Sequence, residues 1–168
     1  MEMFKNKDWK IRKKAGEEVE AILKESRMRI ENIGLNDLMD ALKGGMKDPN
    51  KAVVKVFINL LGSLAEAIGA PVKQFVKKCL VPLISNITDK QSLVRNDVLA
   101  AMNKWKDAIG APAVINKLSA VLEIENPEAR NEGFKWLQEN KDDIPNCDTA
   151  GLVKPLTLCL TDKSKDIR

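Results

Sequence analysis

Two amino acids are missing from this 168-residue sequence, histidine and tyrosine, and aromatics are limited to four Phe and three Trp. Without histidine, the chain lacks the side chain that most often acts as a general acid or base near neutral pH. It also has no glycine-rich phosphate-binding loop, and no Cys or Ser beside a plausible general base. The sequence therefore predicts a protein that is not an enzyme, with no catalytic residues, no cofactor and an aliphatic core.

Cysteine is scarce as well, and long apolar runs are absent. Cys79, Cys147 and Cys159 are odd in number and lack metal-ligand spacing, so we expect free thiols in a reducing compartment and no metal site. The opening MEMFKNKDWK has no apolar run of the signal-peptide kind, and the most apolar stretch, VFINLLGSLAEAIG, is interrupted by Asn59 and Glu66. We expect a cytoplasmic protein without a membrane span.

What is present points to one soluble helical domain. Hydrophobic residues make up 44% of the chain and charged residues 31%, as in folded globular proteins. Leu, Ile, Val and Ala alternate with Glu and Lys, which are good helix formers. The formal net charge is +4, which suits an acidic partner if the positive side chains gather on one face.

A short sequence pattern recurs along the chain. DKQSLVR at 89–95 returns as DKSKDIR at 162–168, and weaker copies are NKDWKIR at 6–12, DPNKAVV at 48–54 and ENPEAR at 125–130. Their apolar anchors are separated by 42, 41, 35 and 38 residues. A period near forty residues is typical of HEAT and armadillo arrays, in which each repeat is a pair of helices. The anchors are Ile11, Val53, Val94, Ala129 and Ile167.

The repeat predicts the fold class: all-α, an α-solenoid of HEAT-like helix pairs, truncated at both ends. We expect a single domain over 1–168, with approximate repeats at 1–31 (partial), 32–69, 70–110, 111–145 and 146–168 (partial). Gly-Ala-Pro at 69–71 and 110–112 marks boundaries, because Gly ends helices and Pro opens them. Pro82 and Pro155 occupy the same repeat position and predict a shared kink.

Some letters of the pattern have structural explanations. Asp89 and Asp162 are expected to cap helix N-termini, and Arg95 and Arg168 to hydrogen-bond the Asp of an adjacent repeat, forming a ladder. The anchors Ile11, Val53, Val94 and Ile167 are expected in the core. So is the stripe Ile11, Ala15, Val19, Ile22 and Leu23, and so are Trp105 and Trp136, which fall within other helical stripes.

The turn positions between these residues are not needed for the core and are therefore candidates for function. Two before the anchor stand Trp9, Lys51, Ser92, Pro127 and Lys165; four before it stand Lys7, Pro49, Lys90, Glu125 and Lys163. Four of the five turns carry Lys, and the fourth is acidic, with Glu123, Glu125 and Glu128. Trp9, between Asp8 and Lys10, has two readings: an exposed hot spot for protein binding, or a core residue folded back over its own repeat.

The run KNKDWKIRKKAGEEVEAILKES, followed by NIGLNDLMDALKGGMKDPNKAVVKVFINLLGSLAEAIG, resembles the TOG domains of the large microtubule polymerases, most closely later members of their arrays such as the fourth. The resemblance covers nearly the whole chain. It implies a paddle of six HEAT repeats whose intra-repeat turns bind the acidic α/β-tubulin heterodimer. The sixth repeat is missing here, and the fourth turn is not basic.

The resemblance also implies which residues bind and where. Trp9 matches the Trp of the first turn, and Lys51, Lys90, Lys163 and Lys165 match basic residues of later turns. The expected tubulin-binding residues are Lys7, Trp9, Lys10, Lys51, Lys90, Lys163 and Lys165. Further expected partners are neighbouring TOG domains of the parent chain, and the expected location is on cytoplasmic microtubules, at the spindle or centrosome.

Two other functions remain open. A generic HEAT scaffold would bind some other protein through its helical faces rather than its turns. A nucleic-acid binder would use a basic groove along a phosphate backbone. The near balance of 28 Lys and Arg against 24 Asp and Glu disfavours nucleic acid, as does the placement of the lysines on turns.

Overall fold

The chain is an array of paired helices in the computed structural model, which describes residues 1–31, 33–124, 126–165 and 167–168. Those residues form helices and connecting turns with no β-strand, so the predicted all-α fold is confirmed. No helix in the described ranges combines the length and apolarity that a bilayer crossing needs.

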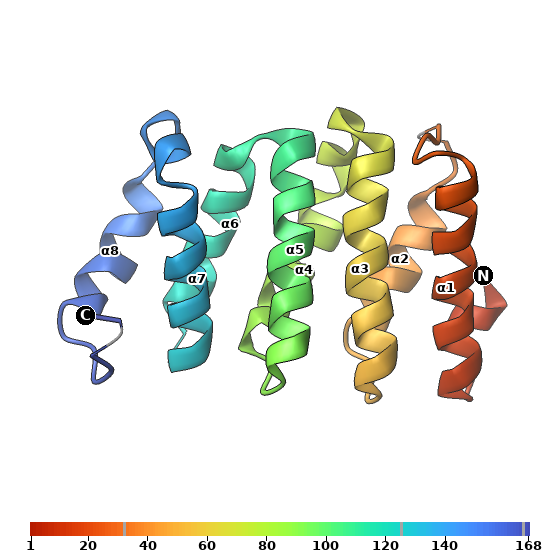
Figure 1. Ribbon diagram of the computed structural model, residues 1–168, viewed down its shortest axis with the longest axis horizontal. Coiled ribbons are helices and arrows are strands. Elements are labelled where there is room, and N and C mark those ends of the chain that lie inside the picture. The colour runs from red at the N-terminus through yellow and green to blue at the C-terminus, as the bar shows by residue number, and fades with distance from the viewer. Residues whose placement is uncertain (32, 125, 166) are drawn as a thin grey trace.

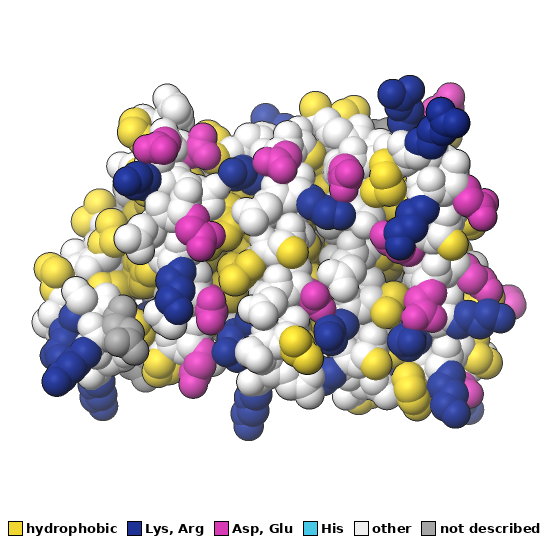
Figure 2. Space-filling model, in the orientation of Figure 1, with side chains coloured by type: hydrophobic (Ala, Val, Ile, Leu, Met, Phe, Trp, Pro, Cys, Tyr) yellow, Lys and Arg dark blue, Asp and Glu magenta, His cyan; other side chains and the backbone are white. Residues whose placement is uncertain are grey.

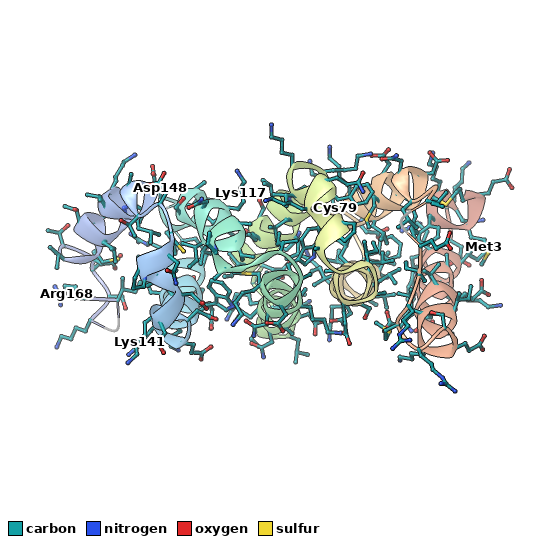
Figure 3. The ribbon with its side chains drawn as sticks, turned by 90° about the horizontal axis from the view of Figure 1, so that it is seen from above. Met3, Cys79, Lys117, Lys141, Asp148 and Arg168 are labelled. Atoms are coloured by element: carbon teal, nitrogen blue, oxygen red, sulfur yellow. The ribbon has the colours of Figure 1, made fainter. Side chains whose placement is uncertain are left out.

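The helices form two layers (Figure 1). The first layer holds the longer members side by side: α1 (Trp9–Glu25), α3 (Lys51–Ile68), α5 (Ser92–Ile109) and α7 (Pro127–Glu139). The second layer holds α2 (Asn36–Gly45), α4 (Val81–Ser85), α6 (Ala111–Leu122) and α8 (Ala150–Cys159). From above, both layers run along the same long axis, with Cys79 and Lys117 on the second (Figure 3). This is the architecture of an α-solenoid.

Short helical segments complete the chain. The 3₁₀ segments are η1 (Glu2–Lys5), η2 (Ala70–Phe75), η4 (Asn86–Thr88) and η5 (Lys141–Asn146), and η3 (Val76–Leu80) is a π-helical turn.

Glycine ends two helices of the first layer as predicted. Gly69 follows α3 with φ of 67°, and Gly110 follows α5 with φ of 88°. Both values lie where residues with a Cβ are disfavoured. Pro71 and Pro112 then stand in the first turns of η2 and α6, so both Gly-Ala-Pro segments mark a change of layer.

Pro82 lies in an irregular helix. The chain passes from 3₁₀ in η2 through the π turn η3 into α4, and again into 3₁₀ in η4. Proline has no N–H and its ring clashes with the carbonyl four residues earlier, which here belongs to Lys78 in the π turn. The helix is therefore irregular around Pro82, whereas α8 is α-helical on both sides of Pro155, so the two prolines do not share one local geometry.

The core fills the space between the layers. Val53, Val94 and Ala129 are fully buried anchors, whereas Ile11 and Ile167 are half-buried. The predicted stripe of α1 is wrong at Ile22, which is 59% exposed. The physical reason is that α1 is the outermost helix of the first layer in Figure 1 and packs against α3 on one side only.

The predicted burial of two tryptophans is confirmed. Trp105 and Trp136 are among the largest fully buried side chains, and Trp136 donates its indole N–H to Asn103 Oδ1 at 2.8 Å. That bond supplies the partner that a buried indole N–H needs.

A candidate protein-binding edge

The N-terminal ends of α1, α3, α5 and α7 lie along one edge of the solenoid, the lower edge in Figure 1. The segment after α8 returns to the same edge. We call this surface the turn edge and define it by residues 6–10, 47–51, 88–93, 123–124, 126–127 and 162–165. The predicted alignment of the turns is therefore present.

Four of the turns share one local geometry. A side-chain oxygen five residues before the anchor accepts the backbone N–H two residues ahead of it, at 2.8 to 2.9 Å. Such Asx turns replace a backbone turn with a side-chain acceptor. The acceptors are Asn6, Asp48, Asp89 and Asp162.

This geometry corrects the prediction that Asp89 caps a helix. The N-cap of α5 is Gln91, which makes no side-chain cap, and Asp89 forms the turn that leads into it. Side-chain caps occur instead at Asp8 on α1, Asn50 on α3 and Asn126 on α7. The Asx turn uses only Oδ1 of Asp89, so Oδ2 remains for another partner.

That second role is an ion pair with the preceding turn. Arg12 Nε and Nη2 donate to the two oxygens of Asp48 at 2.6 and 2.9 Å, and Arg130 Nη1 lies 2.8 Å from Asp162 Oδ2. Val54 stands where the second turn would have its Arg, and Lys51 takes over, 2.6 Å from Asp89 Oδ2. We call these three pairs the charge ladder; a ladder was predicted, but the part of Lys51 was not.

The ladder shifts the titration of its acids. Burial alone raises the pKa of Asp48, but the hydrogen bond from Arg12, the bond from the Asn50 N–H and the Arg12 charge outweigh it and lower the pKa below its usual value. Burial likewise opposes the change at Asp89, where the bonds from Lys51 and the Gln91 N–H prevail and lower the pKa. Both carboxylates are therefore held in their charged form.

A pH dependence of stability follows. An Asp with a folded pKa below its unfolded value of about 3.9 stabilises the fold above that pH, and the stabilisation is lost as pH falls through the folded pKa. We expect the free energy of unfolding to decline between about pH 5 and pH 2. Asp48→Asn should lower it by about 2 kcal/mol at pH 7 and flatten the decline. Urea unfolding at several pH values measures both. The exposed Asp142, replaced in the same way, should leave the slope unchanged, and equal slopes for all three proteins would contradict the ladder's role.

Among the described residues, the ladder has no ion pair between the third and fourth turns. Arg95 Nη1 donates to the carbonyls of Asp89 and Lys90 at 2.9 and 3.2 Å, as Arg12 Nη1 does to Asn6 and Lys7. Its Nε, however, is buried without a partner in the part of the chain that the structure describes. The position that would supply the carboxylate holds Ile124.

Restoring that step should stabilise the domain. Ile124 is 44% exposed, so Ile124→Asp sacrifices little apolar burial and places a carboxylate where Arg95 lacks one. We expect about 1 kcal/mol of added stability, or roughly 3 °C in melting temperature. Ile124→Asn is the matched control, because it can form the Asx turn but carries no charge. An Asp variant no more stable than the Asn variant would rule out the missing pair.

The expected binding residues occupy this edge. Lys7, Lys10, Lys90, Lys163 and Lys165 are exposed, and no ion pair ties any of them among the described residues. Lys51 is 43% exposed and carries its ladder pair with Asp89. Figure 2 shows basic side chains projecting from the lower edge at several points. The structure brings these lysines onto one edge in separate turns rather than into one cluster.

Trp9 is the first residue of α1 and is 38% exposed. It lies outside the hydrophobic core, unlike the other two tryptophans. This placement favours the reading of Trp9 as a contact residue. A half-exposed indole beside Lys7 and Lys10 is the composition of an interface hot spot.

The fourth turn remains different from the others. Glu123 forms an ion pair with Lys154 on α8, and Glu128 is exposed in the first turn of α7. Glu125 lies outside the described residues. Asn126 Nδ2 donates to the Thr88 carbonyl at 3.4 Å, which joins this turn to the third.

Sequence reasoning missed two parts of the edge. Leu93 is 60% exposed at the start of α5, and it could have been found because it directly precedes the buried anchor Val94. A groove of about 700 Å³ lies between the second and third turns, with Lys47 on its rim. No sequence signal marks the groove, because the irregular helix around Pro82 forms one wall.

The described residues offer no support for catalysis or metal binding. They contain no group of three or more His, Cys, Asp and Glu that could hold a metal ion. The three cysteines are free, and burial raises the pKa of Cys79 to about 12, which keeps this thiol protonated.

Comparison with known proteins agrees with this architecture. No family profile matches the chain. Protein MOR1 of Arabidopsis thaliana is 30% identical over 168 residues, which cover 98% of this chain and 8% of MOR1. The chain thus spans about a twelfth of the length of this relative.

Two solved structures share the fold. The MAST/Orbit N-terminal domain superposes with a TM-score of 0.83 at 15% identity, over 99% of this chain and 76% of that one. A structure described as the basis of tubulin recruitment and assembly by microtubule polymerases with tumor overexpressed gene (TOG) domain arrays gives 0.81 at 17% identity, over 99% and 36%.

Proposed function

Starting from a chain with the fold of a TOG domain, we propose that it binds the α/β-tubulin heterodimer through the turn edge. The observation that carries the proposal is the half-exposed Trp9 at one end of an edge whose lysines are exposed in separate turns. MOR1 is similar along nearly the whole chain, and a solved TOG array with the same fold is described as recruiting tubulin.

The edge has the physical properties that such binding needs. Exposed lysines attract an acidic surface and raise the rate of encounter. The Asx turns and the charge ladder fix the backbone beneath these side chains. A fixed backbone reduces the entropy lost on binding.

The proposal extends to the parent protein. The chain would act as one of several TOG domains, promoting microtubule polymerisation in the cytoplasm, at spindle or centrosome microtubules. We further propose a later place in such an array, such as the fourth, because the sequence most resembles those members; the Asp-Trp-Lys-Ile-Arg turn is the most specific part of the resemblance to TOG domains. The five repeats predicted from the sequence, with boundaries near 31, 69, 110 and 145, would each contribute one turn to the edge.

Size-exclusion chromatography with purified tubulin tests the proposal. We expect the chain to co-elute with tubulin at low ionic strength and to separate as salt rises, because exposed charges are screened beyond about 8 Å at physiological salt. Separate elution at every salt concentration would contradict tubulin binding and favour a generic HEAT scaffold. If the complex persisted unchanged as the salt concentration rose, the exposed lysines could not be what holds it together.

A further inference from the structure

The groove between the second and third turns has an apolar wall on which two polar side chains are hydrogen-bonded to their own helix. Val81, 40% exposed, and Pro82 stand on this wall, with Met46 on the opposite side. Of the two polar side chains on this wall, Ser85 Oγ donates to the Val81 carbonyl at 3.0 Å, and Asn86 Nδ2 donates to the Pro82 carbonyl at 2.9 Å. An apolar side chain can therefore enter without stranding a buried polar group.

The rim of the groove is positive. Lys47 and Lys90 are exposed on its two sides, and no ion pair ties either of them within the described ranges. The carboxylate of Asp89 also lines the groove, but Lys51 neutralises it at 2.6 Å. Three ammonium groups thus surround an apolar wall with one carboxylate that is already paired.

We propose that this groove binds a short acidic segment of the partner that carries one apolar side chain. The apolar side chain would lie against Val81 and Pro82, and flanking carboxylates would approach Lys47 and Lys90. The volume of about 700 Å³ falls in the usual range for ligand sites. The inference rests on the proposed function, because it assigns the groove to the tubulin-binding edge.

The groove shares Lys51 and Lys90 with the expected contact residues, but it does not include Trp9 or the lysines of the fifth turn. Trp9 is in the first turn, and Lys163 and Lys165 are in the fifth, whereas the groove is confined to the second and third. Its contribution can therefore be removed without touching Trp9. This separation makes the two proposals testable apart.

The first test uses a synthetic peptide with one Leu between flanking Glu residues, titrated into the isotope-labelled 168-residue chain and followed by NMR. We expect shifts concentrated at residues 81–91. A peptide with Gln in place of Glu, and another with Ser in place of Leu, should each bind at least fivefold more weakly. Shifts spread over the surface, or equal binding of all three peptides, would overturn the inference. A single-stranded oligonucleotide shifting the same residues as strongly would overturn it too, by showing a general anion site.

The second test compares variants of the groove. Lys47→Glu with Lys90→Glu should weaken peptide binding at least tenfold, whereas Lys73→Glu, at an exposed position in η2, should not. Val81→Asp places a carboxylate on the wall, and Ser85→Trp fills the groove from an exposed position. Either should abolish peptide binding and reduce tubulin binding severalfold. The two variants alter different exposed side chains. If one of them fails to fold, the binding measured with the other still tests the groove.

The outcomes separate the two proposals. Undiminished tubulin binding by folded Val81→Asp and Ser85→Trp would retire the groove and leave the turn edge as the tubulin site. If the wild-type chain binds the peptide but not tubulin, the groove stands as a site for acidic segments and the tubulin assignment fails.

Discussion

Trp9→Ala should lower the affinity for tubulin about thirtyfold and leave the domain folded. A Trp at the centre of an interface commonly contributes about 2 kcal/mol or more, which corresponds to that factor. Because Trp9 is 38% exposed and lies outside the core, its truncation should change the free energy of unfolding by no more than about 1 kcal/mol. Melting temperature and tubulin affinity, measured on the same protein, give both values.

Trp105→Ala is the matched control. Trp105 has no exposed surface, so the same truncation should cost about 3–5 kcal/mol of stability. A fall in melting temperature for Trp9→Ala comparable with that of Trp105→Ala would assign Trp9 to the core. Trp9→Glu, which adds a negative charge, should bind an acidic surface more weakly than Trp9→Ala does.

Reversal of three lysines should reduce binding about a hundredfold at low ionic strength. Lys7, Lys90 and Lys163 come from different turns and form no ion pair with other described residues. Electrostatic attraction along one edge raises association rates by roughly ten- to a thousandfold, and its reversal removes that gain. The triple change to Glu should therefore act mainly on the association rate, measured by stopped-flow or surface binding, and its effect should shrink as salt rises.

The control for this experiment carries the same net charge elsewhere. Lys73, Lys77 and Lys141 are exposed and lie outside the turn edge, so their reversal should alter binding by less than about threefold. Lys51 is left unchanged in both proteins because its reversal would place two carboxylates together at Asp89. If both triple variants lost the same amount of binding, the effect would be due to net charge alone and not to the lysines of the turn edge.

Much of the fold could be predicted because the repeat constrains it strongly. An anchor recurring near every forty residues has to face a neighbouring helix, so Val53 and Val94 could be placed in the core from spacing alone. The same reasoning was wrong for Ile11 and Ile167, which are only half-buried in the first and last turns of the chain. The burial of Trp105 and Trp136 followed from helical periodicity. Ile22 could not be placed, since its exposure depends on which side of α1 has a neighbour.

The site was less predictable because it depends on contacts between turns. The recurring Asp and Arg indicated a ladder, yet only the folded geometry shows that Lys51 substitutes for an Arg and that Arg95 Nε is buried without a partner among the described residues. The groove depends on the change from π to α to 3₁₀ helix around Pro82. No local propensity specifies that succession, because tertiary packing decides how the backbone accommodates the proline.

The gap in the charge ladder sets one pair of neighbouring turns apart from the others. Ion pairs connect the first turn to the second, the second to the third, and the fourth to the fifth, whereas among the described residues a 3.4 Å hydrogen bond from Asn126 links the third to the fourth. A partner that changed the distance between Trp9 and Lys90 would have to disturb two ion pairs. One that changed the distance between Lys90 and Lys163 could do so by breaking a neutral hydrogen bond, which contributes less to stability than a hydrogen bond to a charged group.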